Sequence, residues 1–552
     1  MISRTALSHF FMDSSFKILA LVNAMKIAKK MIVLLMAMIF YLEGSNPALA
    51  IDFKITGEWL VGFGAGTGEL YSHYRKAGGG PKYKSNSNDI FEAGQRFRIQ
   101  MEAVASENLS GALSFEIGDI RWGQAETGGA LGADGKIVKV KNAYIDWAVP
   151  DADLNFRMGL QGVALPNAAG GSAVMDADVA AIVANYKFNE VIGLTFAWMR
   201  PVNDNFSGDY FTKPNDTEYY LDNMDLFALS LPITLDGYEI TPWVMYGMLG
   251  KNSLRGLDSV NENEPWETSD GILGLTVPGL TPGLNFQDGN PLNSSATAKG
   301  YGSMFWAGFP VIISVFDPLN IEFDINYGYV EQMGRFNIIK RGNINDIAAG
   351  STKREGWLAK ALIEYKTNFG VPGIFGWFAS GDDGNIKNGS ERFPSIAGAG
   401  NFTSFIGDGN LAWGTFDDSC DWAMTYSGTW GIGLQLRDFT FVEDLKHTFR
   451  IALWGGTNSP SMVKYMESAY SWREGYGGDG PYLTTNDNLL EFNLVNQWSI
   501  YENLELNLEL GYVINMYDKD TWQKPGYYNG TGNGKFEKQD AWKAQLTFAY
   551  TF

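Results

Sequence analysis

Charged side chains recur at every second position along several otherwise apolar stretches of this chain. In 95–102, for example, Arg96, Arg98 and Glu102 alternate with aromatic and aliphatic residues. Because a β-strand turns successive side chains to opposite faces, such stretches have one charged and one apolar face. Facing acidic and basic groups would set up a field that favours small polar solutes in a water-filled passage. The residues expected to line it are Lys54, Glu58, Arg96, Arg98, Glu102, Glu116, Arg157, Glu322, Asp324, Lys360 and Arg450. The alternative is that these charges pair with one another and only fill space.

Enzymatic chemistry finds little support in the sequence. After residue 50 the chain has two histidines, His73 and His447, and neither a Gly-x-Ser-x-Gly nor a His-Glu-x-x-His motif. Glu505 and Glu509 could resemble a glycosidase pair, but alternating strand positions favour lining a lumen. We therefore expect no enzyme.

Bound metals and cofactors are not expected either. The stretch 151–156 begins like a calcium loop, but Phe156 stands where glycine is needed. Acidic loop-like stretches such as Asp382-Asp383 leave room only for loosely bound divalent cations such as calcium. Cys420 is the only cysteine, so an internal disulfide is excluded.

The composition excludes a nucleic-acid-binding protein. The 552 residues are 45% hydrophobic and 14% aromatic, and the net charge is −20. Without residues 1–50, 37 basic and 60 acidic residues remain, a net charge of −23. Nucleic-acid binding needs a basic surface instead.

The N-terminal region reads as an export signal. Lys26, Lys29 and Lys30 precede an apolar run over 31–41, and 48–50 fits the small-x-small rule for cleavage. We expect cleavage after Ala50. The compactness of this signal favours Met25 as the true start, with a long basic region from residue 1 as the alternative.

The rest of the chain alternates short turns with long polar loops, as transmembrane barrels do. Eight short turns joining strand pairs, together with the first and last strands, predict 18 strands, with 16 as the alternative. The turns are expected near 106–110, 150–152, 189–190, 232–237, 317–319, 367–371, 438–447 and 501–503. Very long connections fill 250–302 and 381–422. The small-residue loop 162–179, ending in Asp176 and Asp178, is the candidate for a segment that folds in and narrows the pore.

The last stretch, 541–552, is expected to close the barrel. Its even positions carry a row from Trp542 to Phe552, and Lys543, Gln545 and Thr547 lie on the other face. Every backbone group in hydrocarbon must be paired, so the sheet must close, here by pairing 541–552 with 51–64 and 504–516. A final aromatic residue such as Phe552 resembles the signal that barrel-assembly machinery recognises. We predict an all-β, transmembrane antiparallel β-barrel over 51–552, wide enough to hold water.

Several short segments carry a resemblance to a known family. They include 95–100, 103–111, 115–119, 129–135, 143–147, 158–162, 198–201, 388–392 and 501–504. Together they resemble the outer-membrane homotrimeric porins of Desulfovibrio-type sulfate-reducing bacteria. The resemblance implies a homotrimer in a Gram-negative outer membrane, among lipids and lipopolysaccharide, that lets small hydrophilic solutes and ions diffuse passively. A substrate-selective channel is the first alternative, and an adhesin or structural barrel protein is the second.

Overall fold

The structure is a computed structural model in which part of the chain is described. The described residues are 51–67, 89–125, 128–131, 138–203, 205, 221, 223–251, 280, 300–340, 343–398, 402, 426–465, 482–522 and 540–552. The chain divides into the units Met1–Asp52 and Phe53–Phe552. The expected signal region, His73, Cys420 and most of 250–302 lie outside the described residues. The β-strands belong to the second unit, apart from Asp52 at the start of the first strand.

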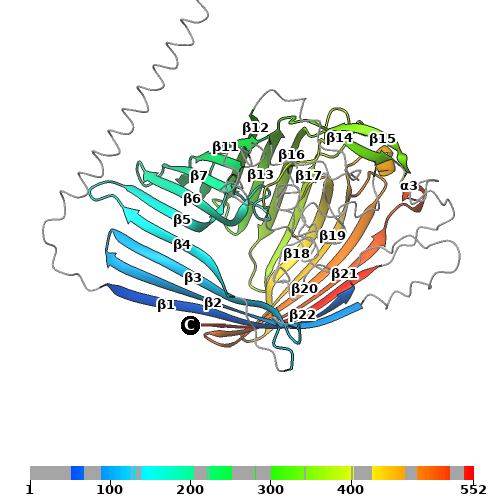
Figure 1. The fold of residues 1–552 in the computed structure, drawn as a ribbon. Helices are drawn as coiled ribbons and strands as arrows, with labels where there is room; N and C mark the ends of the chain where they lie inside the picture. Colours follow the sequence, from blue (N-terminus) through cyan, green and yellow to red (C-terminus); the bar gives the residue numbers. More distant parts are fainter. Residues whose placement is uncertain are drawn as a thin grey trace, which may run out of the picture. The chain divides into compact units, whose positions relative to one another are not determined.

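Twenty strand segments of this unit form one antiparallel sheet, and a separate hairpin adds two more (Figure 1). The segments of the large sheet are β1 (Asp52–Thr67), β2 (Asp89–Ser106), β3 (Leu109–Arg121), β4 (Val138–Ala148), β5 (Leu154–Ala164), β6 (Asp176–Lys187), β7 (Gly193–Asn203), β8 (Asn223–Ser230), β9 (Ile233–Leu235), β10 (Tyr238–Ile240), β11 (Trp243–Gly250), β12 (Tyr301–Ile313), β13 (Leu319–Val330), β16 (Arg354–Tyr365), β17 (Val371–Ala379), β18 (Thr429–Val442), β19 (Leu445–Gly456), β20 (Asn488–Tyr501), β21 (Leu504–Met516) and β22 (Ala541–Thr551).

The predicted count of 18 strands is confirmed once two interrupted strands are each counted as one. Pro232 separates β8 from β9, and Pro242 separates β10 from β11. Proline has no N–H to donate to the neighbouring strand, so each proline interrupts the hydrogen-bonded ladder while the chain continues in the same direction. β9 pairs with β10 and β10 with β12, so the row of strands continues through both breaks.

The first and last strands close the sheet into a barrel, as predicted. β22 pairs with β1 from Glu58↔Thr551 to Gly66↔Lys543, and with β21 on its other side. Beyond the ladder, the Gly57 N–H donates to the Phe552 carbonyl at 2.9 Å and the Phe552 N–H donates back at 3.1 Å. A Cβ on residue 57 would lie 2.4 Å from the Phe552 ring, so glycine makes room for that ring.

The eight predicted short turns all join the expected strand pairs. One of them is tighter than expected, because β18 runs on to Val442 through two bulges and turns at Glu443 and Asp444. Asp444 has a φ of 63°, a left-handed conformation that Asp tolerates in turns.

Some short elements on the loop side were not predicted. The hairpin of β14 (Arg335–Lys340) and β15 (Asn343–Ser351) forms its own two-stranded sheet between β13 and β16. A 3-10 helix, η8, covers Pro460–Tyr465, and α3 covers Lys519–Trp522. Among the described residues no helix has the length and hydropathy of a membrane span.

Side chains alternate between the two faces of the barrel wall. On β13, Ile325 and Tyr327 are 52% and 37% exposed, whereas Asp324 and Asn326 are 1% and 2% exposed. The exposed face carries the large apolar residues along β1, β16 and β18 as well. The large apolar side chains of these strands therefore face outward, as hydrocarbon around the barrel requires, and on β13 the inward face is polar.

Candidate functional site

The inner wall of the first three strands carries a patch of ion pairs. Arg98 on β2 meets Glu116 on β3 at 2.7 Å. Arg96 lies 3.7 Å from Glu58 on β1. Lys54 lies 3.8 Å from Glu102. All six residues were named from sequence, and the register of β1–β3 brings them together.

Two further predicted residues lie on the inner wall of later strands. Arg157 on β5 makes a two-pronged ion pair with Asp146 on β4, at 2.7 and 2.8 Å. Arg450 on β19 donates to the amide oxygen of Gln435 at 3.3 Å. Within the described part of the chain, no carboxylate is recorded within ion-pair distance of Arg450.

Two acidic residues of the inner wall were not named from sequence, and the first is Asp146. Asp146 stands between the outward Ile145 and Trp147, so its parity already indicated the inner face. The second is Glu364 on β16, which accepts hydrogen bonds from Arg437 at 2.5 and 2.8 Å. Only the strand register shows which cation each of them meets.

A buried ion pair lies on the opposite side of the lumen. The Lys360 ammonium on β16 is 3.2 Å from the Asp324 carboxylate on β13, and the two side chains are 0% and 1% exposed. The same ammonium donates to the Gly171 carbonyl at 2.5 Å and lies 5.2 Å from the centre of the Tyr426 ring. Desolvating two charges is costly, so such a pair needs these additional contacts.

Gly171 belongs to the loop 165–175, which connects β5 with β6 and reaches across the lumen. The Ala169 N–H donates to Glu322 on β13 at 2.9 Å, and the Tyr426 hydroxyl donates to the Gly170 carbonyl at 2.6 Å. β13 and β16 are the fifth and sixth barrel strands after β6 in the closed sheet. Three polar contacts therefore fasten the tip of the loop to β13, to β16 and to the segment before β18.

An apolar inner wall explains why this loop folds inward. Leu165, Val174 and Met175 of the loop are at most 3% exposed. They belong to one core with inward side chains of β6 to β12, among them Val179, Ala181, Met199, Leu226, Met245 and Met304. Fully burying an aliphatic side chain is worth about 1.5–3 kcal/mol, so packing on the wall outweighs hydration of the loop.

Asp176 and Asp178 lie on β6 rather than in the loop. The β4–β5 ladder stops at Ala143↔Leu160, while the β5–β6 ladder continues to Ala164↔Asp176. Asp178 lies where β5 leaves β4, and it is held there by an ion pair with Lys141 and a hydrogen bond from the Asn142 amide at 2.8 Å. These contacts stabilise the base of the infolded hairpin.

A second inward segment, 380–398, packs against the first. The Asp176 N–H donates to the Ala397 carbonyl at 2.7 Å. Two buried arginines fasten the segment through backbone carbonyls: Arg354 donates to the Arg392 carbonyl at 3.1 Å and Arg392 to the Ser427 carbonyl at 3.0 Å. No sequence pattern marked these arginines, because their partners come from segments distant in sequence.

The outer part of this segment holds an acidic group. Burial, and the neighbouring charges of Asp382 and Asp383, raise the pKa of Glu391 to about 7. Asp382 is itself buried and accepts hydrogen bonds from the Ser390 hydroxyl at 2.5 Å and from the Tyr482 hydroxyl. Among the described residues no cluster of His, Cys, Asp and Glu has the makings of a metal site.

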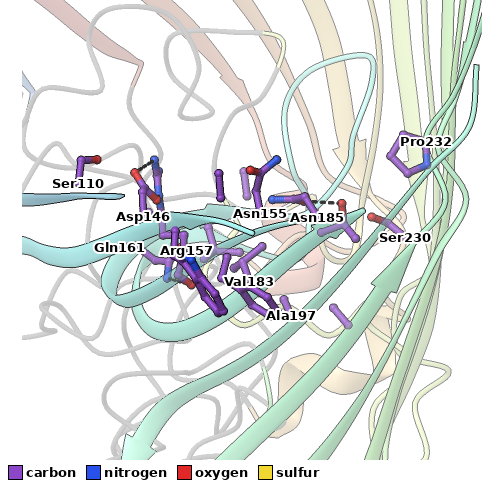
Figure 2. Close-up of a pocket in the computed structure, with 18 of the residues that line it drawn as sticks. Ser110, Asp146, Asn155, Arg157, Gln161, Val183, Asn185, Ala197, Ser230 and Pro232 are labelled. Carbon is purple, nitrogen blue, oxygen red and sulfur yellow. Dashed lines mark hydrogen bonds and ion pairs between the residues drawn. The ribbon is translucent and has the colours of Figure 1, made fainter. Parts of the chain in front are cut away.

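Between the loop 165–175 and the short-turn end of the barrel lies a cavity of about 880 Å³, which we call the vestibule. It is lined by residues of β1 to β8 and of β11, by Leu165 and Pro166 of the loop, and by the turn 106–110. Figure 2 shows the Asp146–Arg157 pair at one side of it, and Asn155, Asn185 and Ser230 along its wall.

Comparison with known proteins gives a likeness of fold at very low identity. The chain matches OpdQ of Pseudomonas aeruginosa with 10% identity and a TM-score of 0.46, over 91% of this chain and 98% of that one. OpdL of the same organism matches with 10% identity and a TM-score of 0.45, over 91% of this chain and 99% of that one. OpdK, solved with vanillate, gives 8% and 0.45, over 91% and 98%. No family model and no curated protein matches the chain. At TM-scores below 0.5, these likenesses carry no functional conclusion.

The barrel's own geometry decides its location. A closed antiparallel sheet of 18 strands with an apolar outer face can satisfy its backbone in lipid. Single-chain barrels of this kind, with an even strand number and short turns at one end, are proteins of the Gram-negative outer membrane. This chain is an outer-membrane β-barrel.

Proposed function

We propose that the protein is a substrate-selective outer-membrane channel for small hydrophilic solutes. The observation that carries the proposal is the loop 165–175, which crosses the lumen and is fastened on the far wall by Glu322, Lys360 and Tyr426. An 18-stranded barrel alone encloses a wide aqueous lumen. A fixed partition of that lumen leaves a smaller path in which wall contacts discriminate between solutes.

The wall chemistry supports the same proposal. Basic and acidic groups face the lumen as near-neutral pairs on β1–β5, while Lys360 and Asp324 are withdrawn into a buried contact. Paired charges order water without giving the lumen a strong field of one sign. We propose that all eleven charged residues named from sequence either line the lumen or support the residues that line it.

A general diffusion porin is the second candidate, favoured by the resemblance to homotrimeric porins. The two can be separated with the full chain in proteoliposomes, by measuring the flux of neutral solutes of graded size at rising concentration. A selective channel gives a flux that saturates and that a second solute of the same class reduces. A flux that rises linearly and depends on size alone would establish the general porin instead. An absence of any ion conductance in planar bilayers would contradict both.

The assembly is also a proposal. The resemblance to homotrimeric porins supports three copies of this barrel, inserted by the barrel-assembly machinery among lipids and lipopolysaccharide. The expected result is a trimer mass for the detergent-purified protein by light scattering with correction for bound detergent. A monomer under mild detergent conditions would contradict it.

A further inference from the structure

The register of five neighbouring strands builds a continuous polar row along the vestibule wall. Asn155 on β5 pairs with Asn185 on β6, which pairs with Thr195 on β7, and Thr195 pairs with Ser230 on β8. Trp243 on β11 ends the row beside Ser230. With about 4.8 Å between strands, the four polar residues span roughly 14 Å. All of them line the cavity.

The next inward row, two residues further along each strand, begins with Arg157 on β5 and is apolar from β6 to β11. It runs through Val183, Ala197, Ala228 and Met245 on β6, β7, β8 and β11. Figure 2 shows Val183 and Ala197 beside Asn185 and near Ser230. The vestibule wall therefore presents a band of amides and hydroxyls directly against a band of aliphatic side chains.

The polar row has hydrogen-bonding capacity to spare. Within it, the Thr195 hydroxyl donates to the Asn185 amide oxygen at 2.7 Å. Among the described residues no partner is recorded for the Asn155 amide or the Ser230 hydroxyl. By contrast, four of the five charged residues that line the vestibule are engaged, since Arg157 is held by both oxygens of Asp146 and Lys54 faces Glu102, while Glu107 lies in the turn 106–110.

From this arrangement we propose that the polar row is a binding subsite for uncharged, polyhydroxylated solutes such as mono- and disaccharides. Sugar hydroxyls both donate and accept, as amides and hydroxyls do, and the C–H faces of a sugar ring pack on aliphatic side chains. A cavity of a few hundred to a thousand Å³ with a few convergent polar groups fits a small ligand. The subsite rests on the proposed channel function and names its solute class.

Current block in planar bilayers tests the subsite, with maltose as the probe and the full chain reconstituted. Maltose is expected to reduce the ion current saturably. Asn155→Ala/Asn185→Ala should raise the half-blocking concentration about tenfold, and Thr195→Val about threefold, because each neutral hydrogen bond contributes modestly. Thr448→Val is the matched control, since Thr448 is an inward threonine of β19 outside the vestibule lining. Its half-blocking concentration of maltose should equal that of the wild type.

The outcomes separate this inference from the proposed function. A wild type without ion conductance contradicts the channel itself. Conductance without saturable maltose block overturns only the subsite, as does an equal loss of block in Thr448→Val. Stronger block by gluconate or glucosamine than by maltose would also overturn it, because it would show that charge is recognised. Heat-modifiable migration of each variant on gels ensures that a folded barrel is compared.

Discussion

At the scale of single residues, the lumen charges are arranged in pairs whose members come from different strands. Arg98 and Glu116 are 18 residues apart in sequence and 2.7 Å apart in the barrel. Their alternation with outward apolar residues was readable from the sequence. The partner of each charge could not be read from the sequence, because pairing depends on the register of the next strand. Alternation alone leaves that register free to shift by two residues.

Neutralising the cations of the first patch should change ion selectivity. In Arg96→Gln/Arg98→Gln, Glu58 and Glu116 lose their partners, so the local field becomes negative and attracts cations. We expect the reversal potential in a salt gradient to shift towards cation selectivity. Glu58→Gln/Glu116→Gln is the matched control and should shift it the opposite way. The same permeability ratio in all three proteins would show that the patch does not border the ion path.

At the scale of elements, two kinds of contact hold the loop 165–175. Its apolar side chains pack on the inner wall of β6 to β12, and Ala169, Gly170 and Gly171 at its tip make polar contacts. A small, apolar loop composition suggested an infolded segment. The span of the loop proved shorter than 162–179, because β5 and β6 extend their own ladder beyond the neighbouring β4.

Removing the buried ammonium should loosen the tip of this loop. Lys360→Met leaves Asp324 buried without its cation, at a cost of about 3–5 kcal/mol. We expect larger and noisier single-channel conductance. The double variant Lys360→Met/Asp324→Leu removes both charges and should recover much of the lost stability. Lys446→Met, an exposed lysine of β19, is the control and should behave like the wild type. Wild-type conductance in Lys360→Met would mean that the contact does not hold the loop.

The segment 382–391 should respond to pH through Glu391. Its pKa is raised to about 7 in the folded loop, so the fold binds an extra proton between about pH 4.5 and 7. Protonation of Glu391 therefore stabilises the folded segment fully below the unfolded pKa of this carboxyl, and that stabilisation is lost as the pH rises through 7.

Hydrogen exchange provides the measurement. After correction for intrinsic rates, protection of 382–391 should be higher at pH 5.5 than at pH 8. Glu391→Gln should make the two values equal, while Glu355→Gln on nearby β16 should keep the difference. An unchanged pH dependence in Glu391→Gln would assign it to another group.

At the scale of the whole molecule, the barrel closes where β1 pairs with β22, which we call the seam. Phe552 exchanges two backbone hydrogen bonds with Gly57, and its ring stacks on Phe97 with the centroids 6.2 Å apart. Closure satisfies the edges of both strands, and an open sheet edge is not tolerated in hydrocarbon.

Deleting Phe552 should therefore impair assembly rather than conductance. We expect a severalfold lower yield of folded barrel in outer membranes, and a wild-type single-channel conductance for the molecules that do fold. Tyr550→Ala, which keeps Phe552 and its contacts with Gly57, is the control. A normal folded yield without Phe552 would show that the seam holds without it.

The sequence by itself determined the periodic part of this protein. Alternation along β13 or β22 fixes which face meets lipid, and eight turns between such strands fix the number of strands, because both signals are local. The tertiary structure decided what depends on register and on long-range contact: that Asp146 meets Arg157, and that Lys360 holds Gly171. It also decided that Asn155, Asn185, Thr195 and Ser230 form one row. These residues lie far apart along the chain, and only the closed ladder of strands brings them together.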